Sequence, residues 1–303
     1  MKENRDGPGS GYTEVSVPYI VARDTLEGTG HLPKFEEDLF HLGSFDLLKG
    51  QDAFLIPTAE VCVCVCVLNM LQLHIMIIYI SLYCRFPCQA CFVSRLLMQM
   101  TCLSIMFVNL LPFGRKQADT RGILRQHHFN KVELVKVSNP EDSHDQHLQM
   151  VSDVELLVQS LELPYRKVLL CSGDTGFAAS ICYDIEVWFP GQQRYREVAS
   201  ISNCTDFQSK RMKFLATRNA FNVSRGDRRS QSIYPHTMNG SGIAVGRALA
   251  AILENYQNAD GTVEIPKVLQ SYLPAEWNDH IPPSKMIKKK TNRIWDFDNV
   301  GNK

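Results

Sequence analysis

The chain has 303 residues, in which 32 Lys+Arg balance 32 Asp+Glu, and 45% of the residues are hydrophobic. This length is enough for one large domain or two modest ones, each with a sizeable core. Zero net charge argues against polyanion binding through bulk charge, although a local basic patch remains compatible with it. Residues 1–10 are polar and mixed in charge, so they predict neither a secretory signal nor an Arg-rich organellar presequence.

Residues 1–60 are expected to begin a mixed α/β domain. The alternating residues from Tyr12 to Pro18 predict a strand that stops at the proline. Gly28-Thr-Gly30 is a turn signal, and residues 32–40 predict a loop and a short helix. Phe54-Leu-Ile56 then predicts a buried strand that leads into polar residues.

Residues 61–113 differ from the rest of the chain in composition. Seven of the ten cysteines fall within residues 62–102, and the 24 positions of 61–84 contain no Asp, Glu, Lys or Arg. Residues 61–67 alternate valine and cysteine, which is what a TG dinucleotide repeat encodes when it is read in frame. We therefore interpret 61–113 as an anomalous, apolar, Cys-rich segment translated from an intron. A membrane-spanning segment, which its polar interruptions disfavour, and an apolar core insertion are alternatives. A metal site at Cys84, Cys88 and Cys91 is a further alternative, which the lack of a second matching pair disfavours.

From Gly114 the mixed composition returns, and residues 114–280 are expected to complete the domain. Residues 123–137 hold two β-rich runs, which predict adjacent antiparallel strands. Tyr183–Phe189 predicts a strand, and the tail at 281–303 is predicted to be disordered. Ser143–Leu161 predicts an amphipathic helix, because apolar residues recur at three- and four-residue steps: Leu148, Val151, Val154, Leu157, Val158 and Leu161.

A second amphipathic helix is predicted within Asn239–Gln257. Its start is expected at a capping side chain, either Asn239 or Ser241. Arg247 then lies near the first turns, where the helix dipole disfavours a cation. An arginine there is explained by a phosphate drawn to the same helix end, or by a surface carboxylate.

Two further segments combine charged and polar residues with apolar ones. Arg196–Arg211 follows a predicted strand, and a carboxylate at such a position suits a Mg²⁺ ion that bridges nucleotide phosphates. A hydrogen-bonded polar loop between strands is the alternative. In Arg125–Glu133, alternate residues share one face of a strand and offer a guanidinium, an aromatic ring and a carboxylate. A solvated face is the alternative there.

Together these segments resemble the catalytic domain of bacterial-type seryl-tRNA synthetases, which are class II aminoacyl-tRNA synthetases. The resemblance covers about 11–60 and 118–275, in order along the chain. The segments that carry it are Gly11-Tyr-Thr-Glu-Val-Ser-Val-Pro-Tyr19, Gly28-Thr-Gly-His-Leu-Pro-Lys-Phe35, Leu55-Ile-Pro-Thr-Ala-Glu60, Asp119-Thr-Arg-Gly-Ile-Leu-Arg-Gln-His-His-Phe-Asn-Lys-Val-Glu133, Glu197–Arg211 and Asn239–Gln257.

This resemblance implies an α+β class II catalytic fold, in which an antiparallel sheet is flanked by helices. It also implies a serine–tRNA ligase, which activates L-serine with ATP and Mg²⁺ to seryl-adenylate and transfers the seryl group to tRNA(Ser). In-line displacement at the α-phosphate needs positioning and charge neutralisation more than a protein nucleophile. The residues implied for serine, with Glu133 on its ammonium and Ser241 near its side chain, are Thr58, Ala59, Glu60, Glu133 and Ser241.

The resemblance implies a second group of residues for ATP. Arg125 and Arg247 are the implied catalytic residues, because they would contact phosphate, and Phe129 would stack on adenine. Glu197 and Ser200 would also hold Mg²⁺. The full set implied for ATP is Arg125, Phe129, Glu197, Val198, Ala199, Ser200 and Arg247.

The chain departs from the family pattern in two places. An arginine that grips the α-phosphate is expected in a Phe-Arg-x-Glu segment before Asp119, where Leu111–Ala118 stands instead, with Arg115 displaced. Losing such a contact typically costs several kcal/mol of transition-state stabilisation, so reduced activity is expected. Few residues precede Gly11, so the long helical arm that grips tRNA in the family is expected to be absent.

The expected partners are L-serine, ATP, tRNA(Ser) and a second copy in a homodimer, with no membrane. The expected location is the cytoplasm, or a mitochondrion or other organelle if the gene is eukaryotic. The alternative function is a catalytically inactive synthetase paralogue that acts as a binding module. Serine-dependent ATP–pyrophosphate exchange separates the two functions, because a binding module would show none.

Overall fold

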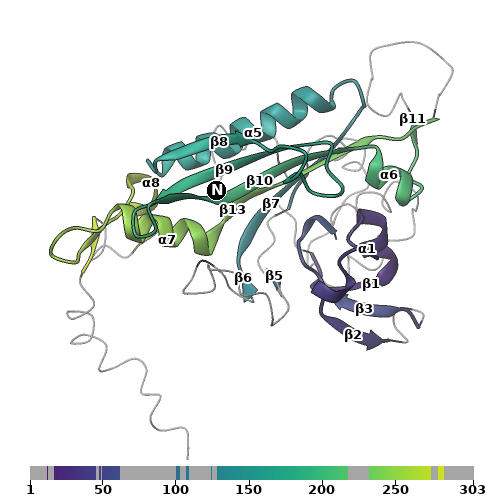
Figure 1. Cartoon of the computed structure of the whole chain (residues 1–303), viewed down its shortest axis with the longest axis horizontal. Coiled ribbons are helices and arrows are strands. Elements are labelled where there is room, and N and C mark those ends of the chain that lie inside the picture. Colours follow the sequence, from purple (N-terminus) through teal and green to yellow (C-terminus); the bar gives the residue numbers. More distant parts are fainter. Residues whose placement is uncertain are drawn as a thin grey trace, which may run out of the picture.

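A computed structural model shows one large sheet with helices and a smaller sheet packed around it (Figure 1). In the six-stranded sheet, every neighbouring pair of strands is antiparallel. The structure describes residues 12, 17–45, 48, 50–61, 100–102, 107–108, 124, 128–217, 232–273 and 279–282. In spatial order, the large sheet contains β4 (Met100–Cys102), β7 (Lys131–Ser138), β13 (His236–Ala244), β10 (Arg194–Thr205), β9 (Ile181–Phe189) and β8 (Tyr165–Leu169).

The two faces of this sheet are covered differently, as β7 shows. Successive side chains on a strand point to opposite faces. Leu134 belongs to a helix-side core, whereas Val135 and Val137 belong to an N-terminal core on the other face. The strands add Ile185, Val187, Phe189, Val198, Ala199, Ile201 and Met238 to the helix-side core; the N-terminal core otherwise contains Val21, Leu26, Leu32, Phe54, Ile56, Ala59, Val61, Phe214 and Ala216.

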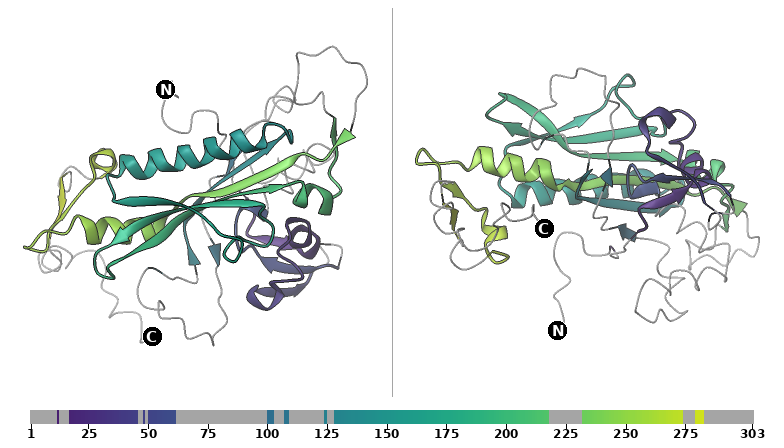
Figure 2. Two further views of the ribbon diagram at one scale, coloured as in Figure 1. Left: turned by 45° about the horizontal axis from the view of Figure 1, so that its top comes forward. Right: turned by 90° about the horizontal axis from the view of Figure 1, so that it is seen from below.

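Two helices cover the helix-side core, α5 (Ser143–Ser160) and α7 (Val245–Asn255). Figure 2 shows them beside the twisted strands of the large sheet. The predicted helix at 143–161 is confirmed, but its buried stripe is rotated: Leu148 is 40% exposed, and His147 and Met150 are buried instead. No helix within the described stretches is long and apolar enough to cross a membrane.

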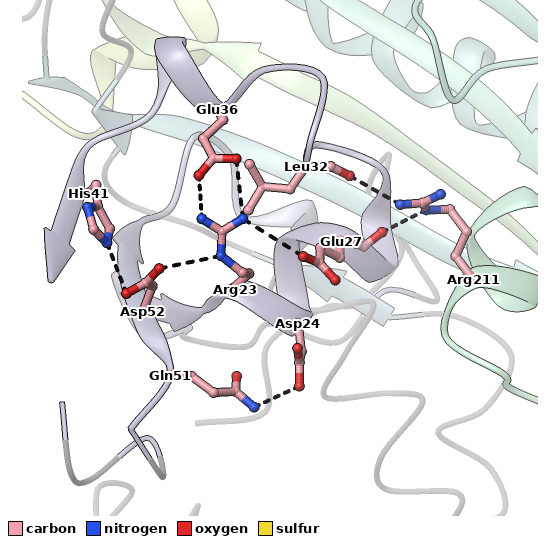
Figure 3. Close-up of polar contacts among 9 residues, drawn as sticks. All are labelled: Arg23, Asp24, Glu27, Leu32, Glu36, His41, Gln51, Asp52 and Arg211. Atoms are coloured by element: carbon pink, nitrogen blue, oxygen red, sulfur yellow. Dashed lines mark hydrogen bonds and ion pairs between the residues drawn. The ribbon is translucent and has the colours of Figure 1, made fainter. Parts of the chain in front are cut away.

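A small N-terminal unit packs against the end of the large sheet through α6 (Phe207–Arg211) (Figures 1 and 2). Its sheet order is β1-β3-β2, and Gly30 ends its helix with a φ of 88°, a left-handed conformation that glycine adopts readily. Arg23 forms ion pairs with Glu27, Glu36 and Asp52 (Figure 3). The elements are β1 (Ile20–Ala22), α1 (Arg23–Thr29), the 3₁₀ helix η1 (Glu36–Asp38), β2 (His41–Ser44) and β3 (Asp52–Leu55).

Short elements complete the described parts of the chain. Three two-stranded ladders join β5 to β6, β11 to β12 and β14 to β15. Their bounds, with that of one more helix, are β5 (Phe107–Val108), β6 (His128–Phe129), β11 (Ala216–Thr217), β12 (Ser232–Ile233), β14 (Val263–Glu264), β15 (His280–Ile281) and α8 (Lys267–Gln270).

Two local predictions are wrong. The β-rich runs of residues 123–137 do not pair with each other: β6 pairs with β5, whereas β7 pairs with β4 and β13, because Asn130 alone separates them and leaves no room for a hairpin. Asn239 and Ser241 do not cap a helix, since they lie on β13, and α7 begins after Ala244 without a side-chain cap. Long-range strand pairing outweighs their capping preference.

Some predictions lie outside the described residues. These are most of the strand expected from Tyr12 to Pro18, the tail beyond residue 282 and most of the segment at 61–113. Within that segment, the backbone of β4 pairs with β7 at the edge of the large sheet.

Candidate active site

Two buried carboxylates form the centre of an inner cluster on the face of the sheet opposite α5 and α7. Glu133 of β7 is 2% exposed and Glu60, which follows β3, is 7% exposed. Asn239 of β13 donates a hydrogen bond from Nδ2 to Glu60 Oε2 at 2.8 Å. Lys131 Nζ lies 2.5 Å from Glu133 Oε2 and donates to Thr58 Oγ1 at 3.3 Å. The inner cluster therefore joins three segments that are far apart in sequence.

Gln208 of α6 holds Glu60 in place through hydrogen bonds. Its Nε2 donates to Glu60 Oε1 at 2.6 Å and to the carbonyl oxygen of Thr29 at 3.2 Å. Its Oε1 accepts a hydrogen bond from Thr237 Oγ1 at 2.6 Å. Because donors reach both oxygens of Glu60, this carboxylate has a fixed orientation.

Burial dominates the electrostatics of the inner cluster. Desolvation raises the pKa of Glu60, and the Gln208 hydrogen bond and the Lys131 charge act against this. Desolvation also raises the pKa of Glu133; Lys131 and an Asn239 hydrogen bond oppose the shift, and the Glu60 charge adds to it. The two carboxylates therefore need a nearby cation to be charged together.

A loop after α1 brings His31 to the same cluster. Thr29 Oγ1 lies 3.2 Å from the carbonyl oxygens of Thr25 and Leu26, to which it can donate, and 2.9 Å from His31 Nδ1. Burial, with the charge of Lys131, lowers the pKa of His31 to about 4. Neutral His31 thus faces Lys131 and Glu133.

Arg211 of α6 fixes this loop from outside. It donates to the carbonyl oxygens of Glu27 at 2.7 Å and Leu32 at 3.1 Å, on either side of His31 (Figure 3). Since Gln208 also bonds to Thr29, the single helix α6 binds three carbonyl groups, two at the end of α1 and one in the loop that follows it.

A cavity of about 250 Å³ opens on the same polar face, and we call it the outer cavity. Strand pairing connects the cavity to the inner cluster along this face. Asn239 pairs with Ser202 of β10, and Ser200, also on β10, pairs with Asp184. Arg247 Nη1 donates to the carbonyl oxygen of Glu197 at 2.7 Å and lies 3.7 Å from its Oε2. The residues that line the cavity are Leu124, Asp184, Glu186, Tyr195, Arg196, Glu197 and Arg247.

The outer cavity is more open than the inner cluster. Its Glu197 side chain is 45% exposed and its Arg247 side chain 33% exposed. Desolvation, together with the charges of Glu197 and Glu186, raises the pKa of Asp184 to about 6, although a Ser200 hydrogen bond opposes the shift. A cation at the carboxylates and an anion at the arginines would relieve these unbalanced charges.

The carboxylates of this cavity suit a divalent ion whose coordination is completed by oxygen atoms of a bound ligand. Within the described stretches, no group of three or more His, Cys, Asp or Glu side chains is arranged to hold a metal. Mg²⁺ is usually bound by one or two carboxylates together with substrate phosphates, so such a prearranged cage is not required. Ser200 lies beside these carboxylates, with a hydrogen bond to Asp184, and its Oγ is also 3.2 Å from Cys182 Sγ.

The structure brings together half of the twelve residues predicted for the site, in two groups. Thr58, Glu60 and Glu133 meet in the inner cluster, and Ser241 pairs with Glu133 in the β7–β13 register. Glu197 and Arg247 meet at the outer cavity, with Arg247 in the first turn of α7 as expected.

Other predicted residues are placed differently. The side chains of Val198 and Ala199 are buried in the helix-side core, and that of Ala59 in the N-terminal core, so these three residues could contact a ligand only through their backbone, and their assignment stays a prediction. Val198 and Ala199 stand at a bulge in β10, and Ala59 follows β3. Phe129 lies on β6 and packs against the N-terminal core. Arg125 lies outside the described residues.

Sequence reasoning missed several residues of the site. Asp184 and Glu186 lie two positions apart on a predicted strand, so the alternation of that strand already put both on one face. Lys131 stands two positions before Glu133 and carried the same signal. His31, Gln208 and Asn239 had no comparable signal, because only the tertiary fold brings their segments together.

Comparison with known proteins agrees with this arrangement. The model of the tRNA synthetase class II core domain (G, H, P, S and T) matches residues 87–256, more than half of the chain. Among the curated relatives, the serine–tRNA ligase of Dichelobacter nodosus is 45% identical over 279 residues, which cover 90% of this chain and 56% of that protein. The chain thus spans about half the length of the curated relatives it matches.

Solved structures give the same result. The seryl-tRNA synthetase of Pyrococcus horikoshii, complexed with ATP, is 34% identical with a TM-score of 0.67, over 90% of this chain and 53% of that one. The cytoplasmic serine–tRNA ligase of Naegleria fowleri, in complex with AMP, is 28% identical with a TM-score of 0.66, over 86% of this chain and 54% of that one. The α+β fold is thus the expected class II catalytic fold, an antiparallel sheet flanked by helices, and the chain belongs to the class II tRNA synthetase core domain family.

Proposed function

We propose that this chain is the catalytic part of a serine–tRNA ligase. It would activate L-serine with ATP to seryl-adenylate, release pyrophosphate, and transfer the seryl group to tRNA(Ser). The observation that carries the proposal is the placement of Glu60 and Glu133 in a buried cluster beside the outer cavity, on one face of the sheet. The 45% identity to a serine–tRNA ligase over 90% of the chain supports the choice of serine.

The inner cluster supplies the groups that serine needs. We assign the substrate ammonium to Glu133 and Thr58, and the hydroxyl to the region of Glu60 and Ser241. Buried polar groups that lose their partner carry a large desolvation cost, so a site built around the serine hydroxyl would reject alanine strongly.

The outer cavity supplies the groups that ATP needs. Arg247 is assigned to the γ-phosphate, and Glu197, with Asp184 and Ser200 beside it, to the Mg²⁺ that accompanies the nucleotide. When bound, this ion would neutralise phosphate charge. The outer cavity would hold the nucleotide and the inner cluster would hold serine, so that binding energy is used to position the serine carboxylate for attack at the α-phosphate. Arg125 and Phe129 are assigned to phosphate and adenine on the resemblance alone.

The assembly proposed for this chain is a homodimer. Exposed apolar side chains gather on the small N-terminal unit, where a second copy would cover them. They are Tyr19 in the segment before β1, Ile20 of β1, Leu42 of β2 and Phe45 after β2.

Serine-dependent ATP–pyrophosphate exchange by the purified chain tests the proposal. We expect exchange with serine and at most 1% of that rate with alanine or threonine, and the Glu133→Gln variant should lose it. Charging of tRNA(Ser) is measured separately. Absence of exchange by well-folded protein would favour an inactive binding module, an alternative that no feature of the described residues supports.

A further inference from the structure

Lys131 occupies the place proposed for the substrate's ammonium group. Its Nζ lies 2.5 Å from Glu133 Oε2 and donates to Thr58 Oγ1 at 3.3 Å. These are the two partners assigned above to the ammonium of serine. The Lys131 side chain is 15% exposed and that of Glu133 is 2% exposed, so the ion pair is shielded from solvent.

A second buried lysine on the same strand shows that this arrangement is specific. Lys136 lies on the opposite face of β7, where its Nζ donates to the neutral Gln146 side chain at 3.4 Å and lies over the Tyr12 ring. Lys131 instead contacts a carboxylate and a hydroxyl. The two lysines therefore lie on the same strand and are both largely shielded from solvent, but their chemical surroundings differ.

The titratable groups that face Lys131 are two carboxylates and a neutral imidazole. Glu133 faces it from its own strand, Glu60 from the turn after β3, and neutral His31 from the loop after α1. Among the described residues named in this cluster, Lys131 is the cation. Its charge lowers the pKa of both carboxyls, whereas burial and their mutual repulsion raise the pKa of Glu133.

We propose that Lys131 is a positioning residue for the amino-acid substrate, whose ammonium stands in for that of serine and keeps Glu133 and Glu60 charged and aligned until serine arrives. This rests on the proposed function. When serine binds, its ammonium replaces Lys131 at Glu133 and Thr58, and no proton has to leave the site. Without Lys131, one buried carboxyl would retain a proton near neutral pH, and serine would have to displace that proton to bind.

The test compares Lys131→Met and Lys131→Arg with the matched variant Lys136→Met, which removes a buried lysine from the other face. The KM for serine and kcat are measured by ATP–pyrophosphate exchange from pH 6 to pH 9. An opposite charge nearby typically shifts a carboxyl pKa by one unit or more. We therefore expect Lys131→Met to raise the serine KM about tenfold at pH 6.5, and this increase should shrink as the pH rises.

The same measurements give both the results expected from the proposal and the results that would overturn it. In Lys131→Met, kcat and the KM for ATP should stay within about twofold of wild type, since the cation acts on serine binding. Lys131→Arg should restore the profile, and Lys136→Met should keep the wild-type profile. A KM increase that is the same at every pH, a decrease in KM, or a loss of kcat alone would each contradict the assignment. If Lys131→Met does not fold, Lys131→Arg alone tests the proposal. A serine KM of Lys131→Arg that differs from the wild-type value at every pH would then contradict the assignment.

A second measurement separates this inference from the proposed function. If wild type shows no exchange, the function fails, and thermal unfolding between pH 4.5 and pH 8 then tests Lys131 alone. A carboxyl with a raised pKa in the folded state loses stability as the pH rises. Lys131→Met should therefore lose stability with rising pH more steeply than wild type or Lys136→Met. Parallel curves would refute the role of Lys131.

Discussion

The two ends of the polar face differ in how completely the protein's own groups satisfy the hydrogen bonds and charges of the side chains there. At the inner end, Glu133 and Glu60 are buried, and side chains from α6, β7 and β13 hold them. At the outer end, Glu197 and Arg247 are exposed by a third or more and bond mainly to each other. The inner end is thus preorganised for one small ligand, whereas the outer end relies on the charge that its ligand brings.

The largest expected effect lies at the inner end. Glu133→Gln keeps the shape of the side chain but removes its charge, so kcat/KM for serine should fall on the order of 100-fold, the value of a hydrogen bond to a charged group. The measurement is ATP–pyrophosphate exchange. The control is Glu155→Gln on α5, whose carboxylate pairs with Lys167 at 2.8 Å and should leave exchange unchanged. Equal losses in both variants would show that the effect is not specific to the inner end.

The contribution of the Gln208 hydrogen bonds at the inner end can be measured through the stability of the chain. Gln208→Leu leaves Glu60 Oε1 and Thr237 Oγ1 without the partners they have in the buried cluster. We expect the free energy of unfolding to fall by about 2 kcal/mol, measured by urea denaturation. Exposed Gln149, which donates to Asp153, provides the control Gln149→Leu, with an expected change below about 0.5 kcal/mol.

The outer end should respond mainly through ATP. Arg247→Gln should raise the KM for ATP about tenfold at low ionic strength, because a charge-assisted contact to phosphate is lost. The KM for serine should stay near the wild-type value. Because Arg247 is partly exposed, the difference should narrow as salt increases. Arg23→Gln, in the remote ion-pair cluster of Figure 3, should change neither KM.

The smallest expected effect concerns pH. The pKa of His31 is about 4 in the folded chain, below its ordinary value of 6.5, so the unfolded chain takes up this proton first as the pH falls. The stability due to neutral His31 is complete above pH 6.5 and is lost towards pH 4. Between pH 7 and pH 5.5, wild type should lose about 1 kcal/mol more than His31→Gln in urea denaturation. A variant that loses as much as wild type would show that His31 is not the group responsible.

The sequence alone predicted elements whose signal is local. The helix at Ser143–Ser160 and the strand at Ile181–Phe189 were both expected, because each has an apolar period typical of its element. Asn239 shows why other features escaped. Its local preference is to cap a helix, but pairing of β13 with β7 and β10 keeps it extended and directs its side chain to Glu60.

The candidate site divides in the same way. The resemblance identified Glu133, Glu60 and Arg247, and the structure groups them as expected. Val198 and Ala199 were grouped with Glu197 as neighbours in sequence, although a bulge and the alternation of β10 turn their side chains into the core. Their backbone remains beside the cavity, but the spacing of residues could not reveal which side chains face it.

The clamp that α6 makes has a consequence for the order of folding. Gln208 bonds to Thr29 and Asn239 bonds to Glu60, and each of these contacts spans 179 positions of the chain. Contacts between such distant segments form slowly, because a long loop must close first. During synthesis, the inner cluster cannot assemble until the chain has been made beyond Asn239. Nascent or fragmented chains that lack β13 are therefore expected to be unable to select an amino acid, even where the N-terminal unit has already folded.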